Sequence, residues 1–183
     1  MSVNNKILDL KSLKLIRNRL KKKKIILCHG VFDLLHVGHI NYFKAARKLG
    51  DILVVSITDD KFVNKGPGRP AFSISNRIKF LLEINCVDYV CVSSFNTAET
   101  IILNLRPNFY CKGNEYTLKK IKLDKNLKEE LIALKSVKGK FKTINQTSFS
   151  SSKFINDNAY QDLDLESKKF IEEIRKKYSL NQI

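Results

Sequence analysis

The chain has 183 residues, 43% of them hydrophobic and 28% charged, which fits one globular domain with a buried core. No apolar run approaches the roughly 18 to 20 residues that a membrane-spanning helix needs, and the charged, periodic N-terminal stretch is unlike a secretory signal, so we expect a cytoplasmic protein. The formal net charge of +16 favours an anionic ligand or surface, although a basic surface without a specific partner would also explain it.

The cysteine pattern argues against a metal–thiolate site. The four cysteines form no CxxC pair, and three of them lie in apolar, strand-like runs. Reduced thiols in the core explain this pattern better than disulfides or zinc ligands do.

In chain order, the sequence predicts a helix at 8–20 and then strands alternating with helices. The strands are predicted at 25–28, 52–57, 89–92 and 109–111, with a weaker one at 140–144. The helices between them are predicted at 37–49, 74–84, 97–105 and 126–137, with a short helix beginning in the serines at 150–152. This alternation predicts an α/β fold, a Rossmann-like doubly wound parallel sheet of about five strands with flanking helices.

Three parts of the chain are distinguished by these patterns. An N-terminal helix occupies residues 1–24, the α/β domain residues 25–158, and a charged helical extension with a sparse apolar stripe residues 159–183.

The segment from Cys28 to His39, CHGVFDLLHVGH, combines a strand end, glycines, an aspartate and two histidines. It lies at the carboxyl end of the first predicted sheet strand, where ligands bind in open α/β sheets, and it enters a helix whose N-terminus favours phosphate. His36 and His39 are three residues apart and share one helix face, and the glycines at 30 and 38 allow close approach. The alternative is that these polar groups are satisfied inside the protein.

The run GVFDLLHVGH resembles the GxFDxxHxGH signature of the cytidylyltransferase-like nucleotidyltransferases. Other stretches are similar to one branch, the heptose 1-phosphate adenylyltransferases and the nucleotidyltransferase halves fused to sugar kinases. These stretches are NYFKAARKLGDILVVSITDDKFVNKGPGRPAF, Arg77, VDYV, RPNFYCKGNEY and FSSSKFIN, and the similarity extends over almost the whole chain.

The resemblance implies roles for residues at the first strand and helix. His36 and His39 would contact the triphosphate and stabilise charge on the α-phosphate, and Asp33 would orient the site near Mg²⁺. The neighbouring nucleotide-binding positions would be Gly30, Val31, Phe32 and Gly38.

Other site positions follow from the same resemblance. Cations near the phosphates or the acceptor would be Lys65, Arg69 and Arg77, whose alternative is an exposed loop charge. The base and ribose would be held by Lys112, Gly113, Asn114 and Glu115. The β- and γ-phosphates would be bound by Ser150, Ser151 and Ser152, for which helix capping is the alternative.

The function expected from these motifs is transfer of a nucleoside monophosphate from ATP or CTP to a sugar phosphate resembling heptose 1-phosphate. Pyrophosphate would be released, Mg²⁺ would accompany the triphosphate, and the product would serve cell-surface glycan synthesis. Partners would include a second copy of the chain and a fused or separate sugar kinase. The choice between ATP and CTP stays open, as does whether the chain stands alone or is a domain of a longer protein.

Three alternative functions remain. Glycerol 3-phosphate or another polyol phosphate could be the acceptor, but the glycerol 3-phosphate enzymes carry an arginine before the serine turn, where this chain has NQTS at 145–148. An RNA-binding or tRNA-charging module would fit the basic charge, yet a KMSKS-like loop is absent and we consider nucleic acid unlikely as a partner. A non-catalytic nucleotide-binding domain is disfavoured because both histidines are present.

Overall fold

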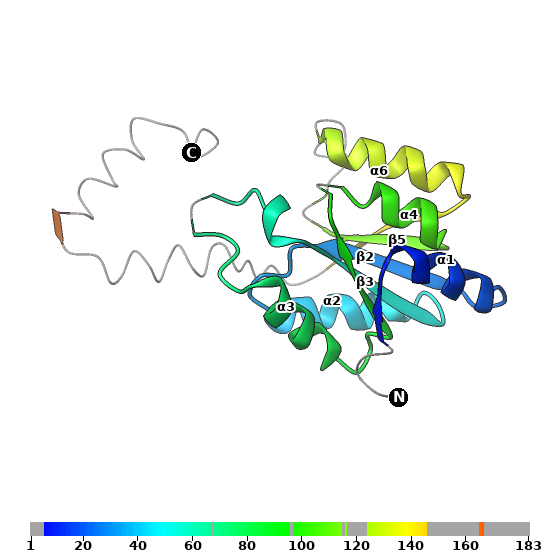
Figure 1. Cartoon of the computed structure of the whole chain (residues 1–183), viewed down its shortest axis with the longest axis horizontal. Coiled ribbons are helices and arrows are strands. Elements are labelled where there is room, and N and C mark those ends of the chain that lie inside the picture. Colours follow the sequence, from blue (N-terminus) through cyan, green and yellow to red (C-terminus); the bar gives the residue numbers. More distant parts are fainter. Residues whose placement is uncertain are drawn as a thin grey trace. The chain divides into compact units, whose positions relative to one another are not determined.

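The computed structural model describes residues 6–66, 68–95, 97–114, 116, 124–145 and 165–166 (Figure 1). The chain divides into two compact units, Met1–Phe149 and Ser150–Ile183. In the first unit, the strands are β1 (Ile7–Leu8), β2 (Ile25–Gly30), β3 (Ile52–Thr58), β4 (Tyr89–Ser93), β5 (Phe109–Gly113) and β6 (Lys140–Ile144). The helices are α1 (Leu10–Arg19), α2 (Val37–Arg47), the 3-10 turn η2 (Asp60–Phe62), α3 (Ile74–Leu82), α4 (Glu99–Leu105) and α6 (Lys125–Ser136).

The strands form one parallel sheet in the order β1-β4-β3-β2-β5-β6. The predicted Rossmann-like parallel fold is therefore confirmed. About five strands were expected, and the described residues contain six, because β1 at the edge was not predicted. β1 has two residues, too few for an alternating or apolar pattern to be visible in the sequence.

Two helical layers cover the sheet, as expected for a doubly wound fold (Figure 1). Alternate residues of β2 point to opposite faces. Ile25 and Leu27 belong to one buried cluster with side chains of α1, α4 and α6, whereas Ile26 and Cys28 belong to a second cluster with side chains of α2 and α3. Both faces of β2 are thus buried, which explains its unbroken apolar run.

The order of the strands reverses beside β2. The chain passes from β2 through α2 to β3 and then to β4, and it returns through α4 to β5 on the other side of β2. The carboxyl ends of β2 and β5 therefore flank the topological switch point, which is where ligands bind in open α/β sheets.

The described residues also bear on the cysteines and on membrane spanning. All four cysteines are free, and Cys28, Cys91 and Cys111 are buried, as predicted for core thiols. Among the helices in the described ranges, none is both long and apolar enough to cross a membrane. The predicted helix start at 150–152 lies outside the described residues, as does the predicted helical extension at 159–183 apart from Leu165 and Glu166. The predicted division at 24 and at 158 stays a prediction.

Candidate active site

The two motif histidines form the N-terminus of α2. His36 is the N-cap, and its Nδ1 accepts the Gly38 N–H at 3.1 Å. His39 occupies the third helical position, and its Nδ1 accepts the His36 N–H at 3.4 Å. Since each Nδ1 is an acceptor, a neutral ring carries its proton on Nε2. The ring centroids lie 4.0 Å apart, so the two imidazoles act side by side at one helix end.

Burial keeps these imidazoles neutral at ordinary pH. The pKa of His39 is lowered to about 4, mainly by burial and additionally by the nearby His36 and the charge of Lys65. Burial also lowers the pKa of His36. The pair therefore presents neutral N–H donors at the positive end of a helix, an arrangement that suits phosphate oxygens.

Phe32 shapes the turn between β2 and the histidines. Its φ is 48°, in the left-handed region that side chains other than glycine rarely occupy. Its ring packs edge-on against His39 at 5.6 Å and lies 5.1 Å from Phe43, centroid to centroid. A Cβ on Gly30 would lie 3.1 Å from the tip of this ring, so Gly30 makes room for Phe32 inside the loop.

Asp33 connects this turn to the segment around Arg69. Its carboxylate oxygens accept the N–H groups of Ala71 at 2.9 Å and Phe72 at 3.0 Å, and Oδ2 also lies 3.1 Å from Nε of Arg69. The side chain is almost fully buried. Asp33 therefore holds the backbone at residues 71–72 beside the motif turn, and its expected indirect role near Mg²⁺ stays a prediction. Within the described ranges, no group of three His, Cys, Asp or Glu side chains could hold a metal ion.

Arg77 is neither at the phosphates or the acceptor nor an exposed loop charge, the two positions that the sequence suggested. Its side chain is fully buried, and its guanidinium donates to the carbonyls of Phe72 at 3.0 Å, Val31 at 2.6 Å and Thr58 at 3.0 Å, and to Asp60. The expectation that Arg77 reaches the phosphates or the acceptor is therefore corrected. One planar group with fixed donors instead fastens the motif turn, the end of β3 and the start of α3 together.

Two other predicted cations do lie beside the motif. Lys65 is exposed and close enough to His39 to lower the pKa of its imidazole. Arg69 is held by its ion pair with Asp33, yet its Nη2 is buried and has no hydrogen-bond partner in the described structure. A buried, unsatisfied guanidinium donor is costly, and an anionic oxygen would satisfy it.

The carboxyl end of β5 supplies a second charged group at the switch point. Lys112 is buried, its Nζ lies 3.4 Å from Glu130 of α6, and it lies over the rings of Tyr110 and Tyr116. Burial, and then the charge of Lys112, lowers the pKa of His29 at the end of β2, so the two strand ends are electrostatically linked.

Glu130 was missed by the sequence reasoning. It accepts the Ala98 N–H at 2.9 Å and the Tyr110 hydroxyl at 2.7 Å and thereby holds Lys112 in place. The available signal was an acidic residue on the apolar face of α6, between Leu127 and Leu134.

The remaining predicted positions are partly visible. The described structure brings Gly30, Val31, Phe32, Gly38, His36 and His39 together, and places Lys112 and Gly113 at the neighbouring strand end. Asn114 is exposed next to them. Glu115 and the three serines at 150–152 lie outside the described residues, so their roles stay predictions.

A comparison with protein families decides the class of this site. Residues 27–176 match the sequence profile of the cytidylyltransferase-like family. The chain belongs to the cytidylyltransferase-like family. The predicted resemblance is thereby confirmed, as is the prediction of a nucleotidyltransferase enzyme.

Similar proteins within this family are curated as bifunctional. The chain is 34% identical over 139 residues to the bifunctional protein HldE of Helicobacter hepaticus, an alignment that covers 75% of this chain and 29% of that protein. It is 43% identical over 115 residues to the HldE protein of Desulfatibacillum aliphaticivorans, which covers 61% of this chain and 24% of the relative. This cytidylyltransferase-like chain thus spans less than a third of the length of the curated relatives that it matches.

Solved structures agree on the fold. A lipopolysaccharide core biosynthesis protein from Thermoplasma volcanium superimposes with a TM-score of 0.55 at 23% identity, covering 70% of this chain and 99% of that one. A pantoate-beta-alanine ligase from Francisella tularensis superimposes with a TM-score of 0.54 at 16% identity, covering 88% of this chain and 82% of the ligase. At these identities the likeness shows a shared fold only.

Proposed function

We propose that this protein transfers a nucleoside monophosphate from ATP or CTP to a sugar phosphate resembling heptose 1-phosphate and releases pyrophosphate. The observation that carries the proposal is the pair of neutral imidazoles at the N-terminus of α2, each with Nδ1 occupied by a backbone N–H. This pair lies at the switch point between β2 and β5, where a nucleotide would meet helix N–H groups.

In the proposed reaction, an oxygen of the acceptor phosphate forms a bond to the α-phosphorus of the triphosphate. The bond from that phosphorus to the bridging oxygen breaks, and the electron pair leaves with pyrophosphate. The acceptor is already an anion, so the protein needs no general base; it has to align the reactants and stabilise growing charge. In this proposal the Nε2–H groups of His36 and His39 donate to the α-phosphate oxygens.

Cations around the histidines would hold the other phosphates. The buried Nη2 of Arg69 lacks a partner, and Lys65 lies beside His39. Mg²⁺ would enter with the triphosphate, and because the oxygens of Asp33 are engaged, we assign this residue to holding the loop at residues 69–72. Asp33 and Arg77 together keep the motif turn in place while the substrates react.

The acceptor and the cellular role are inferred from similarity. The motif stretches resemble heptose 1-phosphate adenylyltransferases, which favours ATP as donor and a sugar 1-phosphate as acceptor. A product of this kind would be a precursor for cell-surface glycans, and a sugar kinase would supply the acceptor, as a fused domain or a separate partner. Homodimer formation and a cytoplasmic location belong to the same proposal.

The test is pyrophosphate release in the presence of Mg²⁺, with ATP and CTP in parallel against heptose 1-phosphate, other sugar 1-phosphates and glycerol 3-phosphate. The expected result is release with ATP and a sugar 1-phosphate and no release from either nucleotide alone. Release only with CTP and glycerol 3-phosphate would replace the proposed substrates. Absence of release with every pair, while calorimetry shows nucleotide binding, would reject transferase activity on this panel.

A further inference from the structure

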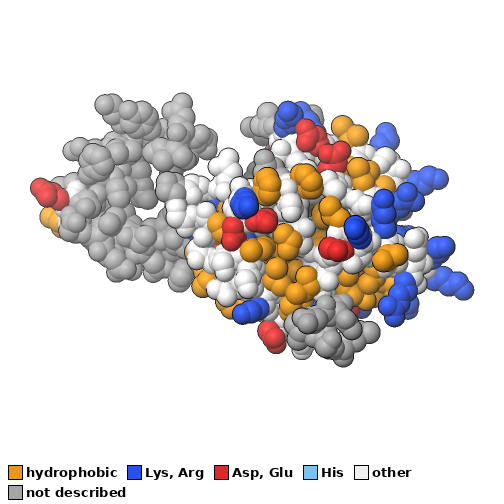
Figure 2. Space-filling model, viewed as in Figure 1, with side chains coloured by type: hydrophobic (Ala, Val, Ile, Leu, Met, Phe, Trp, Pro, Cys, Tyr) orange, Lys and Arg blue, Asp and Glu red, His pale blue; other side chains and the backbone are white. Residues whose placement is uncertain are grey.

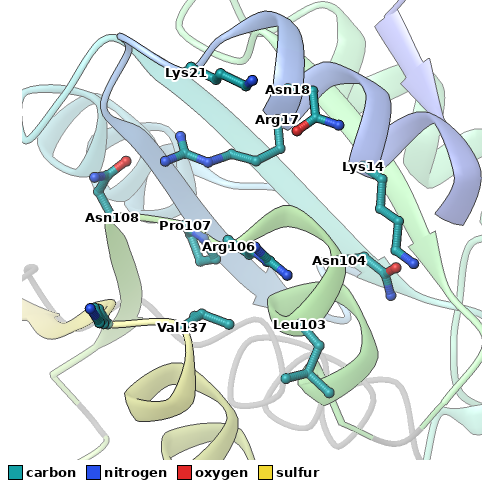
Figure 3. Close-up of a pocket in the computed structure, with 11 residues that line it drawn as sticks. Lys14, Arg17, Asn18, Lys21, Leu103, Asn104, Arg106, Pro107, Asn108 and Val137 are labelled. Carbon is teal, nitrogen blue, oxygen red and sulfur yellow. The ribbon is translucent and has the colours of Figure 1, made fainter.

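A second concave site lies near the amino ends of the strands, whereas the histidines follow the carboxyl end of β2. It is a cavity of about 610 Å³ between the C-terminal half of α1, the end of α4 and the turn after α6. Figure 3 shows side chains of α1 facing those of α4 across this space. Asn108, which lines it, immediately precedes β5, so the cavity adjoins the amino ends of the strands.

The cavity is lined by five cations: Lys14, Arg17, Lys21, Arg106 and Lys138. Among the residues that the structure describes, no carboxylate lines it, and their four ion pairs all lie elsewhere in the fold. On the surface where α1, α4 and α6 end, at the right of Figure 2, Lys and Arg side chains cluster and few acidic side chains lie among them.

Helix ends do not account for this charge. α1, α4 and α6 terminate at the cavity, and each C-terminus carries about half a negative charge. Together, three such helix ends supply less than two negative charges, so most of the positive charge of the five cations is not neutralised by them. Like charges held around one cavity repel one another, so a ligand with several negative charges would gain from all of them at once.

The rest of the lining suits an organic molecule. Leu103, Pro107 and Val137 form an apolar part of the wall. Asn108 is fixed because its Oδ1 accepts the Ile25 N–H at 2.9 Å, which leaves its amide hydrogens for other acceptors. Asn104 is fixed by donating to the Thr100 carbonyl at 2.7 Å. Oriented amides beside cations and an apolar wall are typical of sites that bind polar small molecules.

We propose that this cavity binds a phosphorylated small molecule with at least two phosphate groups, such as a nucleoside diphosphate. The volume lies within the range of about 300 to 1,000 Å³ that small-molecule sites occupy. A compact polyphosphate reaches cations on all three walls, while the apolar wall accommodates the organic part. A single-stranded nucleic acid is the other anion that these cations would attract, and the experiment includes it as an outcome.

The experiment is an NMR titration of the full chain with ADP in the absence of Mg²⁺, observing the side-chain amides of Asn18, Asn104 and Asn108. These three amides line the cavity and report binding there independently of the histidine site. One variant carries Lys14→Gln, Lys21→Gln and Lys138→Gln. The matched control carries Lys48→Gln, Lys125→Gln and Lys128→Gln, also exposed lysines, and loses the same charge outside the cavity.

The expected result is saturable shifts of the three amides, an affinity about tenfold weaker in the cavity variant, and a change of less than about twofold in the control. Pyrophosphate release should survive in both variants, which separates this site from the proposed transferase site. The proposal is overturned if the amides do not shift, if both variants weaken binding equally, or if a single-stranded RNA shifts these amides and ADP does not.

Discussion

Substituting His39 separates two roles of one imidazole. Its Nδ1 accepts the backbone N–H of His36 at 3.4 Å, and its Nε2 is the donor that we assign to the α-phosphate. The amide of Asn reaches about as far as Nδ1, and the longer Gln carries its amide about as far as Nε2. His39→Asn therefore keeps the acceptor of the helix cap and removes the distal donor, whereas His39→Gln keeps a distal donor.

The sizes of these effects follow from the contacts. Losing a helix cap costs about 0.5 to 2 kcal/mol, and each kcal/mol shifts the melting temperature of a folded unit of this size by about 2 to 4 °C. Removing one donor to a transition-state oxyanion costs a factor of about 10² to 10³ in kcat. We expect His39→Asn to melt within about 2 °C of the parent and to lose that factor in kcat, and His39→Gln to keep about ten times more activity than His39→Asn.

Steady-state pyrophosphate release and thermal melting by circular dichroism measure both quantities. Asn41→Gln, an exposed substitution on the same helix, is the control and should leave both unchanged. Equal turnover of the Asn and Gln variants at the parent's level would refute the assignment of Nε2 as the catalytic donor.

Three further predictions concern stability. The pKa of His39 is lowered from 6.5 to about 4, mainly by burial, so the unfolded chain binds a proton more tightly than the folded protein does. The contribution of His39 to the free energy of unfolding should therefore be complete above pH 6.5 and fall by about 3 kcal/mol towards pH 4, and urea unfolding across pH should show a shallower fall for His39→Asn. Arg77→Lys should cost about 3 to 5 kcal/mol in urea unfolding because lysine cannot bridge the same four acceptors, whereas the exposed control Arg19→Lys should change stability by less than about 0.5 kcal/mol. Gly30→Ala should cost about 1 to 3 kcal/mol, since its Cβ would press on the Phe32 ring, and an unchanged melting temperature would contradict that packing.

The local part of the fold was predictable because apolar runs end at clear boundaries. β2, β3, β4 and β5 begin at the predicted residues and extend one or two residues further, since their ends carry small or polar residues that hide the strand pattern. The end of α4 was predicted from Pro107, and the chain turns there through Arg106 with φ of 50°. β1 was not predictable because its pairing with β4 depends on tertiary contacts.

Within the site, spacing predicted neighbours on one helix and missed partners far apart in sequence. The shared face of His36 and His39 follows from helical geometry. The pairing of Asp33 with Ala71 and Phe72 spans nearly forty residues, and no local pattern shows it. Arg77 looks like any helix-surface cation in the sequence, and only the packing of the motif turn and the end of β3 around it makes it a buried cross-link.

The most direct test of nucleotidyl transfer is to measure where the α-phosphate and the γ-phosphate of the triphosphate go. ATP radiolabelled at the α-phosphate or at the γ-phosphate is incubated with heptose 1-phosphate and Mg²⁺. The products are separated, their radioactivity is counted, and they are identified by mass spectrometry. We predict that the α-label enters a nucleoside diphosphate sugar and the γ-label enters pyrophosphate, and that the His36→Ala/His39→Ala protein, folded by circular dichroism, forms neither. Transfer of the γ-label to the sugar, or undiminished product from the double variant, would contradict this function of the histidine site.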